Sequence, residues 1–78
     1  MVCTSITIAQ PKPVVSNVVA SNPSGQAVRV TWSQNVQGEV RVILDNTNIQ
    51  QGIYPAGANY LNIDNVAYGT HQICVEAV

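Results

Sequence analysis

The 78-residue chain has few charged and few aromatic side chains. It contains no phenylalanine and one tryptophan, Trp32, which is therefore the largest apolar side chain available to fill a core. Charged residues make up 9% of the chain, against about a quarter in an average soluble protein, and the net charge is -1. Because phosphate binding needs a basic stripe, this composition argues against nucleic acid as a partner.

Long apolar runs are also missing. No stretch approaches the roughly 18 consecutive apolar residues of a membrane span, and the first ten residues lack the basic and apolar regions of a signal peptide. Two origins stay open: a protein that starts at Met1 and folds without export, or a mature or excised domain with an added methionine. The length predicts a single domain, residues 1–78, near the lower limit for folding on one core.

What the chain does contain is alternation of apolar and polar residues, clearest over residues 26–33, where Val28, Val30 and Trp32 share one face. Strands are predicted at 2–8, 14–20, 26–33, 39–45, near Ile49, at 60–64 and at 70–78. About seven short strands without helical periodicity predict an all-β, antiparallel sandwich. The predicted core comprises Val28, Val30, Trp32, Val40, Val42, Leu44, Leu61, Ile63, Ile73 and Val75.

Three pieces of sequence occur in an order that resembles a fibronectin type III or related bacterial immunoglobulin-like domain over residues 11–78. They are the prolines Pro11 and Pro13, the strand V-R-V-T-W that ends in Trp32, and V-A-Y-G-T-H-Q-I-C-V-E-A-V at 66–78. The resemblance implies an immunoglobulin-like sandwich that serves as a spacer, an adhesion module or a particle-surface decoration, with no chemistry of its own.

The chain departs from the family pattern at three points. Gln72 stands where the family has a corner tyrosine, Tyr68 replaces a proline, and the sequence stops where the family supplies one more strand. The N-terminal strand at 2–8 is a candidate to fill that edge, which would place Cys3 beside Cys74.

Cys3 and Cys74 are the only two cysteines, and alternation directs both away from the predicted core. If the two end strands are neighbours, a disulfide closing a loop of about 70 residues would contribute roughly 4 kcal/mol in the chain-entropy model. We favour this bridge, and two reduced thiols are the alternative. Two cysteines and one histidine do not form a usual zinc set, so no metal site is predicted.

No catalytic site is predicted. The single histidine, His71, has no carboxylate or nucleophile among its strand neighbours, so we interpret it as a surface residue. The segment 45–48, D-N-T-N, is oxygen-rich but lacks the glutamate and glycine of a calcium loop, and we interpret it as an Asx turn. Nothing brings Asp45 and Asp64 together as a carboxylate pair. We therefore predict neither an enzyme nor a cofactor.

Several apolar or aromatic residues are candidates for partner contact. Ile43 is an apolar residue on the solvent side of its strand, and residues 51–58 form a predicted loop with apolar content. Tyrosines suit half-wet interfaces, although plain packing is the competing interpretation for each of them. The predicted contact residues are Ile43, Ile53, Tyr54, Pro55 and Tyr60.

These observations favour a non-catalytic structural or interaction module. The leading hypothesis is a small accessory subunit, either a decoration or cement protein of a virus particle or a filament subunit, oligomeric within its assembly and located on a virion or extracellular surface. The alternative is a spacer or carbohydrate-contacting module of a secreted multidomain enzyme or adhesin.

Overall fold

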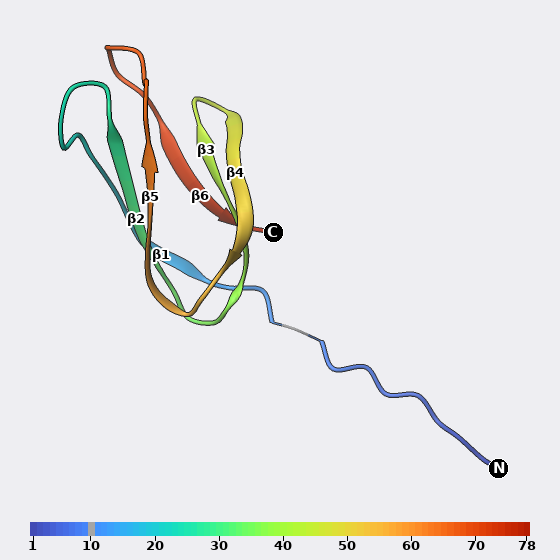
Figure 1. The fold of residues 1–78 in the computed structure, drawn as a ribbon. Helices are drawn as coiled ribbons and strands as arrows, with labels where there is room; N and C mark the ends of the chain where they lie inside the picture. The colour runs from blue at the N-terminus through green and yellow to red at the C-terminus, as the bar shows by residue number, and fades with distance from the viewer. Residues whose placement is uncertain (10) are drawn as a thin grey trace.

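The computed structural model describes residues 1–9 and 11–78, and over these residues the chain is all-β, with six strands in two antiparallel sheets (Figure 1). One sheet has the order β1-β2-β5 and the other the order β4-β3-β6. The strands are β1 (Val15–Ser21), β2 (Val28–Gln34), β3 (Gly38–Leu44), β4 (Thr47–Tyr54), β5 (Gly57–Ile63) and β6 (Ile73–Ala77).

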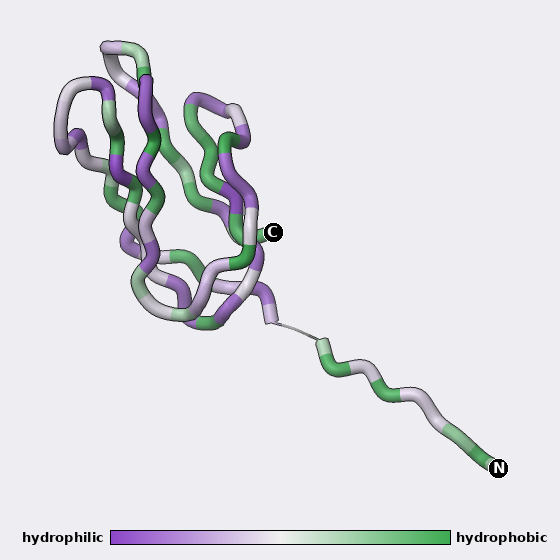
Figure 2. The backbone as a smooth tube through the Cα atoms, in the orientation of Figure 1, coloured by the Kyte–Doolittle hydropathy of each residue, from purple (hydrophilic) through white to green (hydrophobic). Residues whose placement is uncertain are grey.

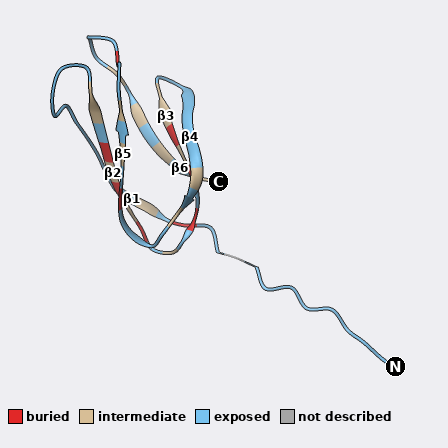
Figure 3. Cartoon of the chain, in the orientation of Figure 1, coloured by how far each residue is buried: buried red, intermediate tan, exposed pale blue. Residues whose placement is uncertain are grey.

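The core lies between the central strands of the two sheets. Val30 and Trp32 of β2 and Val40 and Val42 of β3 are each at most 1% exposed, and Figure 3 shows buried positions on both strands. The ring of Trp32 meets the ring of Tyr54 edge to face, with centroids 5.0 Å apart. The partly buried residues that pack against this cluster include Val15, Val28, Leu61, Ile63, Ile73 and Val75.

The observed core differs from the predicted core at two residues. Leu44, at the end of β3, is only partly buried and lies outside the cluster, because the chain turns directly after it. Val66, in the loop before β6, is 6% exposed although it was not predicted to be core.

A buried polar network closes one end of the core. Gln34 and Asn59 are 5% and 9% exposed. The Trp32 indole Nε1 donates to Gln34 Oε1 over 2.7 Å, and Asn59 Nδ2 donates to the carbonyl of Pro55 over 3.0 Å. The indole donor is thereby satisfied inside the protein, which removes the cost of burying an unpaired polar group.

Strand β1 contains a bulge, and beyond it the side chains that point toward the core are at even-numbered instead of odd-numbered positions. Val15 pairs with Gln34 and Ala20 with Val30, but the register shifts between Ser16 and Val19. Asn17 lies at this shift with a φ of 52°, as expected for a bulge that inserts an extra residue. Because of the bulge, residues 15–21 do not keep one alternation of inward and outward side chains along the whole strand.

The turn between β3 and β4 is a tight hairpin. Asp45 and Asn46 have positive φ values of 49° and 66°, and Leu44 pairs directly with Thr47. Two consecutive left-handed residues are the signature of a type I′ turn, which Asp and Asn tolerate well. The predicted turn at 45–48 is therefore shorter than expected, since Thr47 and Asn48 already belong to β4.

The predicted loop over 51–58 is wrong. Strand β4 continues to Tyr54 and β5 begins at Gly57, so only Pro55 and Ala56 connect the two strands. The glycine at 52 is compatible with a strand because it pairs with Val40 of β3. The connection passes from one sheet to the other.

The predicted strand at 2–8 is absent, so the described residues form six strands where about seven were expected. Residues 1–9, named here the N-terminal arm, have no regular secondary structure and are all exposed. The arm extends away from the rest of the chain (Figures 1 and 2). The radius of gyration is accordingly 16.4 Å, against about 11.5 Å for a compact chain of this length. Alternation makes a strand only where a neighbouring strand supplies hydrogen-bond partners.

Candidate functional site

Two surfaces of the structure have features of an interaction site: an open side of the two sheets, and a hollow on the outer face of one sheet. We name the first the open flank. It consists of the outer edge of β6 and the inward-facing residues Val18 and Ala20 of β1.

Apolar side chains of the open flank remain in contact with water. Ala20 pairs with Val30, whose side chain is fully buried, so Ala20 and Val18, two residues before it, belong to the inward face. Val18 is nevertheless 41% exposed and Ala20 is also exposed. On β6, Ile73 and Val75 are only partly buried. The flank therefore has inward-facing apolar residues that are incompletely covered, beside a β6 edge with which no other described strand pairs.

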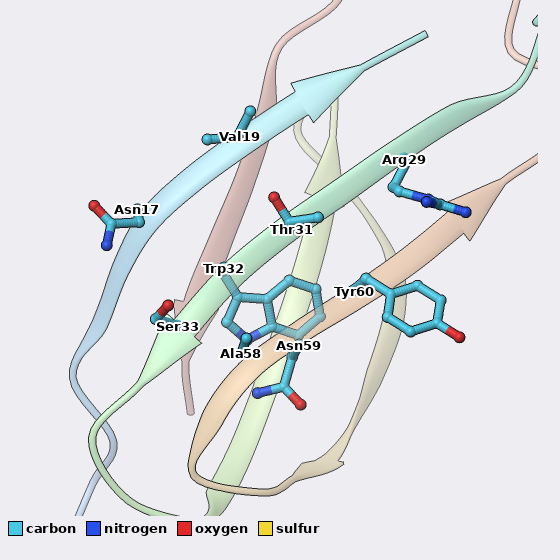
Figure 4. Close-up of a pocket in the computed structure, with 9 residues that line it drawn as sticks. All are labelled: Asn17, Val19, Arg29, Thr31, Trp32, Ser33, Ala58, Asn59 and Tyr60. Carbon is cyan, nitrogen blue, oxygen red and sulfur yellow. The ribbon is translucent and has the colours of Figure 1, made fainter. Parts of the chain in front are cut away.

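The hollow lies on the outer face of the sheet β1-β2-β5 and has a volume of about 660 Å³ (Figure 4). The Arg29 guanidinium lies 5.6 Å from the ring centre of Tyr60, and Arg29 Nε donates to Asn62 Oδ1 over 3.0 Å. Trp32 also borders the hollow but is 1% exposed, so its ring belongs to the core. Lining residues are Asn17, Val19, Arg29, Thr31, Trp32, Ser33, Ala58, Asn59 and Tyr60.

This hollow combines an aromatic ring, a cation and amide groups. Tyr60 is 61% exposed. The Arg29 side chain lies next to the Tyr60 ring and is itself hydrogen-bonded to Asn62. A flat ring next to polar side chains suits a half-wet contact, either with a protein or with the apolar face of a sugar. No nucleophile activated by a base is found among the lining residues.

The structure gives His71 a carboxylate partner that sequence neighbours did not reveal. His71 Nδ1 lies 2.5 Å from Asp45 Oδ2, and His71 Nε2 lies 2.6 Å from the carbonyl oxygen of Ala67. The backbone N–H of Gln72 also donates to Asp45 Oδ1 over 2.9 Å. These contacts join the β3–β4 turn to the loop before β6, and we name them the His71 latch.

The His71 latch is built for a charged imidazole. Because both ring nitrogens face acceptors, the doubly protonated form makes two donor contacts. The hydrogen bond to Asp45 raises the pKa of His71, and the Ala67 carbonyl adds to this effect. The pKa of Asp45 is lowered by the hydrogen bond from His71 and then by that from Gln72. Asp64 takes no part in the latch.

The latch has the geometry of a structural contact. Among the described residues, no group of three or more His, Cys, Asp or Glu side chains is placed to hold a metal ion.

The described part of the chain also contains no helix that is long and apolar enough to cross a membrane.

The predicted disulfide between Cys3 and Cys74 is not formed. Both cysteines are free and exposed. Cys74 lies on β6, with its side chain on the face opposite Ile73 and Val75, whereas Cys3 lies in the N-terminal arm. The bridge required the arm to pair with β6 of the same chain, and this pairing is absent.

The five predicted contact residues separate in the structure. Tyr54 is half-buried, and its ring packs edge to face against Trp32. Ile43 is also only partly exposed. Ile53, Pro55 and Tyr60 are exposed, and Ile53 borders a second hollow together with Pro11, Pro13 and Val78.

Sequence reasoning missed three residues that shape these surfaces. Gln34 continues the inward alternation of Val28, Val30 and Trp32, and this signal could have identified it as buried. Arg29 and Asn62 are on the outward faces of their strands, but only the pairing of β2 with β5 brings them together.

Comparison with known proteins finds no protein-family model that matches the chain. Neither a curated protein nor a solved structure shows significant similarity to it.

Proposed function

We propose that the chain is a non-catalytic structural module that forms part of a larger protein assembly. The open flank is the observation that carries this proposal. A protein that leaves inward-facing valine and alanine side chains exposed beside a free strand edge gains stability when a partner covers them. The low charge content adds support, since weak charge repulsion suits a surface packed against a neighbour.

The proposed architecture is an immunoglobulin-like sandwich of six strands. Support comes from the two antiparallel sheets with a shared core and from the resemblance of residues 11–78 to fibronectin type III domains. In this proposal the module is an accessory subunit, such as a decoration or cement protein of a virus particle or a filament subunit, on a virion or extracellular surface.

The test is sedimentation of the protein from its native source. We expect it to sediment with a larger particle or filament in a fixed molar ratio. Recovery of the chain only as a free monomer would contradict the proposal, as would a reading frame that joins it to catalytic modules.

A matched pair of variants tests whether the open flank makes the contact. Val18 and Val19 are neighbours on opposite faces of β1 and are 41% and 56% exposed. Val18→Asp should reduce the sedimenting fraction because it places a charge on the flank, whereas Val19→Asp should leave it unchanged. Equal effects of both substitutions would exclude the flank as the contact surface.

The hollow around Tyr60 supports a second candidate function, carbohydrate contact by a module of a secreted enzyme or adhesin. The exposed ring, the Arg29 guanidinium and the Asn62 amide offer stacking and hydrogen bonding in one place. A glycan array tests this candidate: Tyr60→Ala should abolish binding, while Tyr68→Ala, which removes an exposed tyrosine elsewhere, should not. An array without any bound glycan would exclude this function.

A further inference from the structure

The outer edge of β6 is well suited to receive another strand. Strand β6 pairs with β3 in a regular register, without a bulge, and none of the other described strands pairs with its second edge. It also lacks proline and lysine, two residues that commonly block an exposed edge. Of the other edges, β1 is interrupted by its bulge, and the pairing of β4 with β3 shifts between Val42 and Ile43. The edge of β5 is as regular as that of β6, but the exposed inward-facing Val18 and Ala20 are on β1, at the opposite edge of its sheet.

The N-terminal arm has the pattern of a strand that could fill this edge. Val2, Thr4, Ile6 and Ile8 alternate with polar or small residues, and the arm contains no charged side chain. Val2, Ile6 and Ile8 are 99%, 88% and 90% exposed. As a strand, residues 2–8 would span about 23 Å and the five residues of β6 span about 16 Å, so the arm can cover β6 completely.

We propose that residues 2–8 of one copy bind as an antiparallel strand along β6 of a second copy. Alternation then directs Val2, Ile6 and Ile8 toward the inward face of the second copy, where they cover Val18 and its neighbours. This inference rests on the proposed function and names the partner at the open flank as another copy of the same chain.

The position of the arm favours binding to β6 of a second copy over binding to β6 of its own copy. Pro13 is buried against Gly38, where an added Cβ would lie 2.6 Å from the proline Cδ, so the root of the arm is fixed at that point. Pro11, Pro13 and Val78 border the same hollow, which places this root near the C-terminal end of β6. To reach β6 of its own copy, the arm would have to fold back and run parallel to that strand.

An arm from another copy is free of this constraint. It can approach in the antiparallel direction, which every strand pair in the structure adopts. Prolines at 11 and 13 favour an extended exit from the body. Because each copy has one arm and one free β6 edge, the contact is head to tail and builds an open chain or a closed ring; two copies that exchange arms form a dimer.

The first experiment measures molecular mass by sedimentation equilibrium under reducing conditions over a range of protein concentrations. The wild-type mass should rise with concentration, and Ile6→Asp should remain a monomer because it would bury a charge on the inward face. Ser5→Asp is the matched control, since it adds the same charge on the outward face, and its mass should rise as in the wild type. Trp32 fluorescence verifies that each variant is folded.

The second experiment uses Cys74 as a reporter of the pairing. In the antiparallel alignments that let residues 2–8 span all of β6, the residue opposite Cys74 on the outward face is Ser5 or Thr7, so the variants are Cys3→Ser with Ser5→Cys and Cys3→Ser with Thr7→Cys. Oxidised glutathione accepts two electrons and two protons as the two facing thiols form a disulfide. Non-reducing electrophoresis of one of these variants should then show linked copies, either a dimer from exchanged arms or a ladder that begins at the dimer, and Cys3→Ser alone should show no species above the dimer.

Three results would overturn the inference. They are a wild-type chain that stays monomeric at all concentrations, a disulfide that forms within the monomer of both cysteine variants without linked copies, and self-association that persists in Ile6→Asp. If the chain is monomeric but still sediments with a larger assembly, the inference fails while the proposed function stands. If neither association occurs, both fail.

Discussion

The centre and the flank of the molecule contain similar residues in very different environments. Val30 and Val42, on the central strands, have no exposed surface, whereas Val18, which also faces inward, is 41% exposed. The central strands have a neighbour on both sides and a sheet opposite. Strand β1 is hydrogen-bonded to β2 alone, and β6 is at the edge of the other sheet.

This difference shows that burial depends on the number of neighbouring strands as well as on the type of residue. Hydrophobic stabilisation is proportional to the apolar area removed from water. A valine that has no strand to cover it contributes little to the stability of an isolated copy, but it remains available to a partner. Substitutions at the centre should therefore lower the free energy of unfolding more than substitutions at the open flank.

The largest effect is expected at the centre. Trp32→Ala should reduce the free energy of unfolding by about 3–5 kcal/mol, because it leaves a cavity and leaves Gln34 without its indole donor. Tyr60→Ala, on the outer face, should change this free energy by less than about 0.5 kcal/mol. Urea titration followed by circular dichroism measures both values. Equal effects would show that Trp32 does not hold the sheets together.

A matched valine pair compares centre and flank directly. Val30→Ala should reduce the free energy of unfolding of the monomer by about 2 kcal/mol, and Val18→Ala by less than about 0.5 kcal/mol. The measurement is a urea titration at a concentration where the protein is monomeric. If Val18→Ala costs as much as Val30→Ala, the flank is closed in solution.

The smallest effect is expected at the His71 latch, which is on the surface. The raised pKa of His71 means that its contribution to stability is fully present below the ordinary value of 6.5 and is lost as the pH rises through the raised value. The lowered pKa of Asp45 means that its contribution is present above 3.8 and is lost as the pH falls through the lowered value.

The urea midpoint should therefore be highest between these two ordinary values and should decline as the pH rises from 6.5 through the raised pKa of His71. In His71→Gln this decline toward alkaline pH should disappear. A wild-type midpoint that does not change across the titration of His71 would contradict the role of the latch.

Much of the two-sheet body could be predicted from local pattern. The alternation of Val28, Val30 and Trp32 and that of Val40 and Val42 identified β2, β3 and the centre of the core, because a half-buried strand has a period of two. The Asp-Asn pair at 45 and 46 likewise indicated the turn between β3 and β4.

The errors occurred where a feature depends on distant residues. Gly52 and Pro55 suggested a loop, but pairing with β3 maintains β4 as far as Tyr54. The arm has the same alternation as a strand, yet no edge pairs with it. The partnership of Asp45 with His71 spans 26 residues and leaves no signal in the neighbouring sequence.

The sequence alone determined which segments can form strands and which side chains each strand directs inward, because alternation depends only on backbone geometry. The tertiary structure decided which of those side chains are buried, which strand edges remain free and which polar groups meet. These outcomes depend on which strands become neighbours, and neighbours are selected by packing over the whole chain.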